Sequence, residues 1–137
     1  MLDKLDNTLR FQQQALNLLT KRQNILASNV ANADTPGYLA KDIDFSTELK
    51  KVVSNNVSAP GPIQLSLTSG RHLAGTNTAK QSVELLYRVP DQPSMDGNTV
   101  DMDRERMNFV DNNMKYQSSL TFLGSQIKGM STLLSQG

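Results

Sequence analysis

The sequence contains no cysteine and no tryptophan, and aromatic residues make up only 5% of its 137 positions. The absence of cysteine excludes a disulfide framework, a thiol nucleophile and a cysteine-based zinc site. An excess of one charge is also lacking, because 14 basic residues stand against 13 acidic ones and leave a net charge of +1. This balance argues against a dedicated nucleic-acid or membrane-surface binder, which normally carries a clustered basic excess. The length suits one domain.

Long apolar runs are absent as well. No segment reaches the roughly 20 apolar residues that span a bilayer. The N-terminal stretch Met1–Asp6 lacks the basic region and the apolar run of a cleavable signal peptide. If the protein leaves the cytoplasm, we therefore expect it to use a route that does not need such a signal.

Side chains with catalytic or metal-binding chemistry are sparse. The one histidine, His72, lies in a loop rich in Gly, Thr and Asn, and a metal there would need carboxylates as its other ligands. Asp101, Asp103 and Glu105 form an acidic cluster, but its place at a helix start favours capping over cation binding. Neither a Ser/His/Asp arrangement nor a phosphate-binding glycine loop is present. We predict a protein that is not an enzyme, with no catalytic residue, metal, cofactor or small-molecule substrate.

What the sequence does contain is a heptad pattern at each end. Apolar residues recur in steps of three and four, which predicts two amphipathic helices that pair as a coiled-coil-like hairpin. The first seam is Leu2, Leu5, Leu9, Gln12, Leu16, Leu19, Gln23, Leu26, Val30 and Ala33. The second seam is Met102, Arg106, Phe109, Asn113, Tyr116, Leu120, Leu123, Ile127, Met130 and Leu134.

The C-terminal helix is poorly suited to full exposure. After Arg106 its only charged residues are Asp111, Lys115 and Lys128, and a second apolar set (Met107, Val110, Met114, with Gln117) lies beside the seam. A single hairpin cannot cover both the seam and these weakly polar flanks. We therefore expect the remaining surface to be an interface with other chains.

The segment between the helices reads as a loop-rich insertion. Asp44 is a plausible N-cap for a short helix with Phe45, Leu49, Val52 and Val53 on one face. Alternating residues predict strands over 63–67 and 83–89. The expected fold class is thus mainly α, with paired terminal helices and a small β insertion. The chain is expected to divide into 1–38 (N-terminal core helix and turn), 39–100 (insertion) and 101–137 (C-terminal core helix).

Two turns flank the insertion. Asn29 and Asn32 tolerate the left-handed conformation that ends helices, and Pro36-Gly37 is typical of a type II turn before an extended segment at Tyr38. Asp96-Gly97-Asn98 predicts a second turn, and Asp101 or Asp103 could cap the last helix.

These two stretches also carry a resemblance to a known family. Asn29–Tyr38 resembles the N-terminal signature of bacterial flagellar axial proteins, which include the rod, hook and hook-associated families. Asp96–Glu105, followed by Asn113, Tyr116 and Leu120, resembles the proximal-rod branch of that family. The resemblance implies a structural subunit of the rod, the drive shaft that crosses the periplasm in the basal body. It also implies self-assembly into a helical tube and export by the flagellar type III apparatus.

The resemblance further implies partners. These are copies of the same chain, other proximal rod subunits (FlgC-like and FlgF-like), a FliE-like protein at the junction with the MS ring, and the export gate. Nucleic acid is not among them. From the residues alone, an intracellular coiled-coil adaptor or export chaperone remains the alternative. The candidate assembly residues are Leu9, Leu16, Leu19, Leu26, Asn29, Asn32, Thr35, Pro36, Gly37, Tyr38, Asp96, Gly97, Asn98, Asp101, Asn113, Tyr116, Leu120, Leu123 and Ile127.

Overall fold

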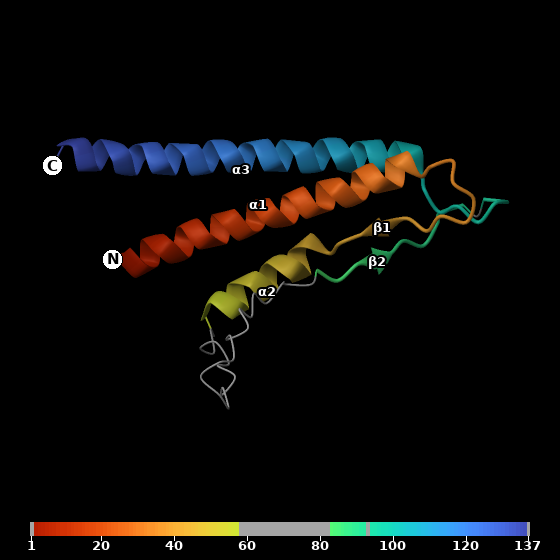
Figure 1. Ribbon diagram of the computed structural model, residues 1–137, viewed down its shortest axis with the longest axis horizontal. Helices are drawn as coiled ribbons and strands as arrows, with labels where there is room; N and C mark the ends of the chain where they lie inside the picture. Colours follow the sequence, from red (N-terminus) through yellow and green to blue (C-terminus); the bar gives the residue numbers. More distant parts are fainter. Residues whose placement is uncertain (1, 58–82, 93, 137) are drawn as a thin grey trace, which may run out of the picture.

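The computed structural model describes residues 2–57, 83–92 and 94–136. Along the chain these form α1 (Leu2–Ala31), β1 (Lys41–Asp42), α2 (Phe45–Val57), β2 (Leu86–Tyr87) and α3 (Met102–Gln136). Helix α1 lies in the middle, with α3 on one side and α2 with the strands on the other (Figure 1). The predicted fold class is confirmed. The expected strand over 63–67 and His72 lie outside the described residues.

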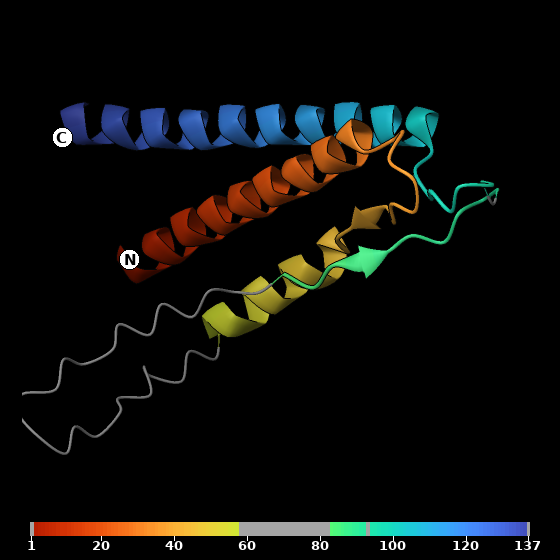
Figure 2. The same ribbon diagram turned by 45° about the vertical axis from the view of Figure 1, so that its right-hand side comes forward.

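The two terminal helices run antiparallel and form a V. They are closest where α1 ends and α3 begins, and they separate toward the chain termini, which lie at the same end of the molecule (Figure 2). None of the described helices is both long and apolar enough to cross a membrane. The apolar core is small and follows α1, with Leu18, Leu19 and Leu26 at most 5% exposed. Ala40, Ile43 and Val52 add to it from the insertion.

The seam predicted on α3 is correct at every second position only. The side chains that are buried or half-buried are Met102, Glu105, Asn108, Phe109, Asn112, Tyr116, Ser119, Leu123, Gln126 and Met130. The predicted partners Arg106, Asn113, Leu120, Ile127 and Leu134 are exposed instead. For Arg106, Asn113, Leu120 and Ile127 the buried or half-buried residue comes one position earlier and is polar, which apolar spacing cannot reveal; Leu133, before Leu134, is exposed as well.

The insertion matches its prediction in part. Asp44 caps α2 as expected, because its carboxylate accepts hydrogen bonds from the Thr47 backbone N–H (3.1 Å) and hydroxyl (2.7 Å). However, Val53 is 47% exposed and Glu48 takes a buried place on that helix. The strand expected over 83–89 is reduced to Leu86–Tyr87, paired antiparallel with Lys41–Asp42.

The apolar side chains over 85–89 are exposed, from 47% at Leu85 to 83% at Val89, whereas Val83 is half-buried. The physical reason is that, among the described elements, β2 packs only against β1 in a two-stranded sheet, so no helix or further strand there covers its side chains.

Candidate functional site

The two sequence motifs meet at one junction, at the end of the molecule opposite the termini. Its centre is Asn98, which is 6% exposed. The Asn98 side-chain amide donates to the carbonyls of Asn32 (3.0 Å), Ala33 (2.8 Å) and Thr35 (2.9 Å), where α1 has just ended. Its side-chain oxygen accepts from the Val100 N–H at 2.8 Å. One side chain therefore caps the end of α1 and shapes the approach to α3.

Backbone contacts close the same junction. Gly37 N–H donates to the Asp96 carbonyl (2.8 Å), and Thr99 N–H donates to the Tyr38 carbonyl (3.0 Å). The Tyr38 N–H bonds to the Thr35 carbonyl, and Gly37 has a φ of +72°, which confirms the predicted type II turn. Gly97 has a φ of +74°, and a Cβ added there would lie 3.7 Å from the Gly37 Cα. The two turns thus favour glycine because each places this residue in the left-handed conformation, which strains a residue with a Cβ.

Substitution of Gly37 by alanine should lower the free energy of unfolding by about 1 kcal/mol, because the left-handed conformation strains a residue with a Cβ. No atom would obstruct that Cβ, so backbone strain is the whole effect. The matched control is Gly124→Ala in α3, where space is also open. There the same change should raise stability by roughly 0.5–1 kcal/mol, since alanine favours helix. Urea unfolding of both variants checks this, and equal signs would contradict it.

Asn29 connects α1 to the first strand. It is fully buried; its amide donates to the Lys41 carbonyl (2.7 Å) and to Glu105 Oε2 (3.2 Å). Its oxygen accepts from the Lys41 N–H (3.1 Å) and the Tyr38 hydroxyl (3.3 Å). The side chain therefore pairs with both backbone groups of Lys41, as a neighbouring strand would, and every hydrogen-bonding group of Asn29 is satisfied.

A chain of four charges lies beside Asn29. Arg22 makes a bidentate contact to Asp42, with nitrogen–oxygen distances of 3.0 and 3.1 Å. Arg88 bridges the same carboxylate (2.5 Å) and the carboxylate of Glu105. Their side chains are 1–18% exposed and come from α1, β1, the end of β2 and α3. Two positive and two negative groups cancel, so the cluster joins four segments without a net buried charge.

The electrostatics of Asp42 follow from this arrangement. Burial acts to raise the pKa of its carboxyl, but hydrogen bonds from Arg22, Arg88 and the Ile43 N–H, with the charge of Arg22, together outweigh burial. The pKa of Asp42 therefore lies below its ordinary value of 3.8. The hydrogen bond to Asp42 in turn raises the pKa of Arg22, against the opposing effect of burial.

Acid should weaken the fold through Asp42. Because its pKa is lower in the folded than in the unfolded chain, its contribution is complete above the unfolded value and is lost as pH falls through the folded one. We expect Tm to decrease below a pH of about 4. Asp42→Asn should lower Tm at pH 7 and make the decrease in acid less steep, which thermal melts across pH would measure. An unchanged acid slope in this variant would argue that other carboxylates dominate.

The acidic cluster at the start of α3 divides in the structure. Asp101 is the N-cap, since its carboxylate accepts from the N–H groups of Asp103 (3.0 Å) and Arg104 (3.2 Å). Glu105, which belongs to the acidic cluster for which capping was predicted, is instead buried in the charge chain. Within the described ranges, His, Asp and Glu side chains form no group that could hold a metal ion.

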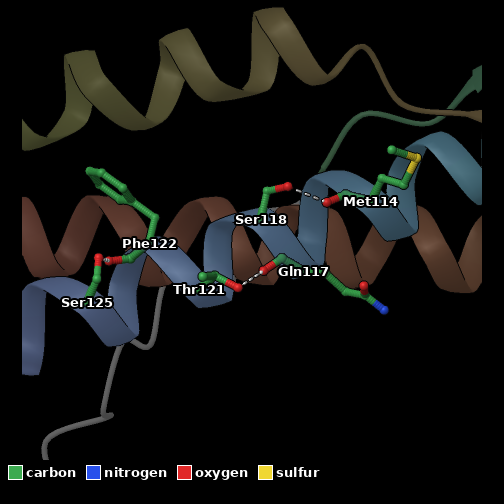
Figure 3. A pocket seen from close by; sticks show the side chains of 6 residues that line it. All are labelled: Met114, Gln117, Ser118, Thr121, Phe122 and Ser125. Atoms are coloured by element: carbon green, nitrogen blue, oxygen red, sulfur yellow. Dashed lines mark hydrogen bonds between the residues drawn. The ribbon is translucent and has the colours of Figure 1, made fainter.

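The outer surface of α3 carries the second candidate site. Figure 3 shows a shallow hollow on this helix, lined by Met114, Gln117, Ser118, Thr121, Phe122 and Ser125. The hydroxyls of Ser118, Thr121 and Ser125 bond to carbonyls of their own helix at 2.8–3.0 Å. Because these polar groups turn back to the backbone, the hollow presents mainly carbon and sulfur, with Met114 65% and Phe122 52% exposed.

A separate groove runs between α1 and α3. Its lining residues are Thr20, Gln23, Asn24, Phe109, Asn113 and Tyr116, and its volume is about 330 Å³. Beyond it along α3, Leu120 is 44% and Ile127 51% exposed. They follow Asn113 at seven-residue intervals, so the three side chains form one line on the helix. A helix from another chain could lie along this line.

The predicted site residues therefore fall into three places. The junction holds Asn29, Asn32, Thr35, Pro36, Gly37, Tyr38, Asp96, Gly97, Asn98 and Asp101. The buried or half-buried surfaces of α1 and α3 hold Leu9, Leu16, Leu19, Leu26, Tyr116 and Leu123. The exposed line on α3 holds Asn113, Leu120 and Ile127.

Sequence reasoning missed the charge chain and the buried Asn112. Asp42 is 20 positions from Arg22 and 46 positions from Arg88. One signal was available for Asn112, which begins an Asn pair in a helix with few charges, but the pattern does not say which of the two faces inward.

Known proteins resemble the chain closely. The family model described as flagella basal body rod protein matches residues 9–38, which cover most of α1 and the turn after it. Curated relatives match over the full length: proteins of Yersinia enterocolitica (62% identical, 100% of both chains), Salmonella typhimurium (61%, 100% of this chain and 99% of that one) and Escherichia coli (57%, 100% and 99%). Each is named flagellar basal body rod protein FlgB.

The paired terminal helices and the turn motif are thus those of a rod component of the bacterial flagellar basal body. With identities near 60% across the whole length, the chain belongs to the FlgB family of these proteins.

Proposed function

We propose that the chain is a structural subunit of the proximal rod, without enzymatic activity. In this role it assembles with copies of itself and with other rod proteins into the helical drive shaft. That shaft joins the MS ring and export gate to the distal rod. The observation that carries the proposal is that α3, a helix with few charges, leaves Met107, Val110, Met114, Leu120 and Ile127 exposed by 44–66%.

The shape of the molecule supports assembly into a filament. A drive shaft must resist twisting, and helices as long as α1 and α3 supply long surfaces over which subunits interlock. The exposed line on α3 and the hollow beside it are different surfaces, so a neighbour can contact each without using the same residues. Heterologous contacts of this kind, repeated by a screw rotation, build an open filament instead of a closed dimer.

The proposed partners follow from the position of the subunit. They are other proximal rod subunits of the FlgC-like and FlgF-like types, a FliE-like protein at the MS-ring junction, and the flagellar type III export gate. The proposed location is the rod in the periplasmic space, reached without a cleavable signal peptide. The likeness of Asp96–Glu105 to the proximal-rod branch supports this placement.

Deletion of the gene tests the proposal. Cells lacking it should not swim, and electron microscopy of their basal bodies should show membrane rings without a rod. The wild-type gene, supplied in trans, should restore both. Motile deletion cells with intact rods would overturn the proposal and favour an adaptor or chaperone role.

A further inference from the structure

Three columns of residues run along the side of α3 that faces α1. The shared column is Met102, Phe109, Tyr116, Leu123 and Met130. The polar column is Glu105, Asn112, Ser119 and Gln126. The leucine column is Arg106, Asn113, Leu120, Ile127 and Leu134. With seven residues in two turns, the polar and leucine columns lie on opposite sides of the shared column, each about 50° from it.

The structure turns the less apolar of the two outer columns inward. The polar column is buried or half-buried throughout, whereas Leu120 and Ile127 remain 44% and 51% exposed. Rotating α3 about its own axis by about 50° would turn the polar column outward and bury Leu120 and Ile127 of the leucine column against α1. Hydrophobic burial favours that rotation from residue 119 onward, because Leu120 and Ile127 would then face α1 in place of Ser119 and Gln126. A specific contact must therefore hold the observed rotation.

Asn112 provides that contact. It is fully buried, and its amide donates to the Leu19 carbonyl (3.0 Å) and to Gln23 Oε1 (2.6 Å), both on α1. Rotation toward the leucine column would withdraw the amide from both acceptors. The polar column also carries a cost that favours the rotated arrangement. Asn112 Oδ1 and Gln126 Oε1 are buried and accept no hydrogen bond within the described part of the chain. Such atoms raise the free energy of the observed rotation and bring the two arrangements closer.

We propose that Asn112 is a positioning residue that fixes the rotation of α3 and so keeps Leu120 and Ile127 on the outside of the subunit. Resting on the proposed function, these two side chains are then available to a second copy of the chain. The second copy can contact the leucine column only while that column is exposed, so its binding further favours the observed rotation of α3. In this view, the polar column is retained because it prevents the subunit from burying its own assembly surface.

The absence of cysteine from the sequence allows a direct test. Single variants Gln126→Cys and Ile127→Cys report on the inward and outward columns of the purified subunit through their rates of reaction with a maleimide. We expect Ile127→Cys to react at least about tenfold faster than Gln126→Cys, because packing protects the inward thiol. Adding Asn112→Ala should bring this ratio to one or below. The matched control is Asn113→Ala, one position along, which should leave the ratio unchanged.

A second variant protects the test against unfolding. Asn113→Leu removes no hydrogen bond to α1 among the described residues but makes the leucine column more apolar, so it too should lower the ratio. Circular dichroism establishes that each variant remains helical. An unaltered ratio in both helical Asn112→Ala and Asn113→Leu would overturn the proposal. The experiment uses isolated subunits, so its failure is distinct from failure of the rod function, which motility and basal-body images decide.

Discussion

Arg88→Ala should lower the free energy of unfolding by about 3–5 kcal/mol, the usual cost of removing one partner of a buried ion pair. Arg88 is the common partner of Asp42 and Glu105, and the Glu105 side chain is only 1% exposed. Without the guanidinium, the Glu105 carboxylate would keep one hydrogen-bond donor among the described residues, the Asn29 amide at 3.2 Å. The effect is therefore expected to come from uncompensated buried charge more than from the lost attraction itself.

The structure offers a matched control for Arg88. Arg104 also pairs with one carboxylate, Asp91, at 3.0 Å, but the two side chains are 45% and 74% exposed. Arg104→Ala should cost less than about 1 kcal/mol, since solvent screens such pairs. Urea unfolding followed by circular dichroism compares the two. The double variant Arg88→Ala with Glu105→Gln should recover part of the loss. Equal effects of Arg88→Ala and Arg104→Ala would disprove the importance of burial here.

Local features of this fold could be predicted from the sequence. The helix caps at Asp44 and Asp101 and the type II turn at Pro36-Gly37 depend on residues within four positions of one another. The extents of α1 and α3 follow from heptad spacing, which is also local. For the same reason the two motifs could be recognised separately, although nothing local showed that Asn98 would bond to the end of α1.

The rotation of α3 and the charge chain could not be predicted in the same way. The polar and leucine columns lie at the same angular distance from the shared column and differ mainly in hydrophobicity. Apolar spacing therefore selects the leucine column as the seam. The structure selects the other column through buried hydrogen bonds of Glu105 and Asn112. Glu105 bonds to Asn29, 76 positions away, and to Arg88, 17 positions away, and Asn112 bonds to Leu19, 93 positions away. Whether a polar side chain finds a partner at such a separation depends on the assembled tertiary structure.

Replacing Leu120 and Ile127 by serine should abolish swimming while leaving the subunit folded. Both side chains are already about half exposed, so the isolated chain loses little burial. In the assembled rod each would bury its remaining surface, which contributes about 1 kcal/mol per side chain. Loss of both would weaken each subunit contact by roughly 30-fold, since about 1.4 kcal/mol corresponds to a factor of ten. The same weakening recurs at every subunit added to the filament.

Val53→Ser is the matched control for that experiment. Val53 is 47% exposed, close to the values for Leu120 and Ile127, but it lies on α2, away from the exposed line on α3. Cells carrying Val53→Ser should swim normally, and both variant proteins should accumulate to wild-type levels. Normal swimming of the Leu120→Ser, Ile127→Ser cells would remove the leucine column from the assembly surface. Swimming lost equally in Val53→Ser cells would indicate that general loss of apolar surface, and not a specific contact along α3, causes the defect.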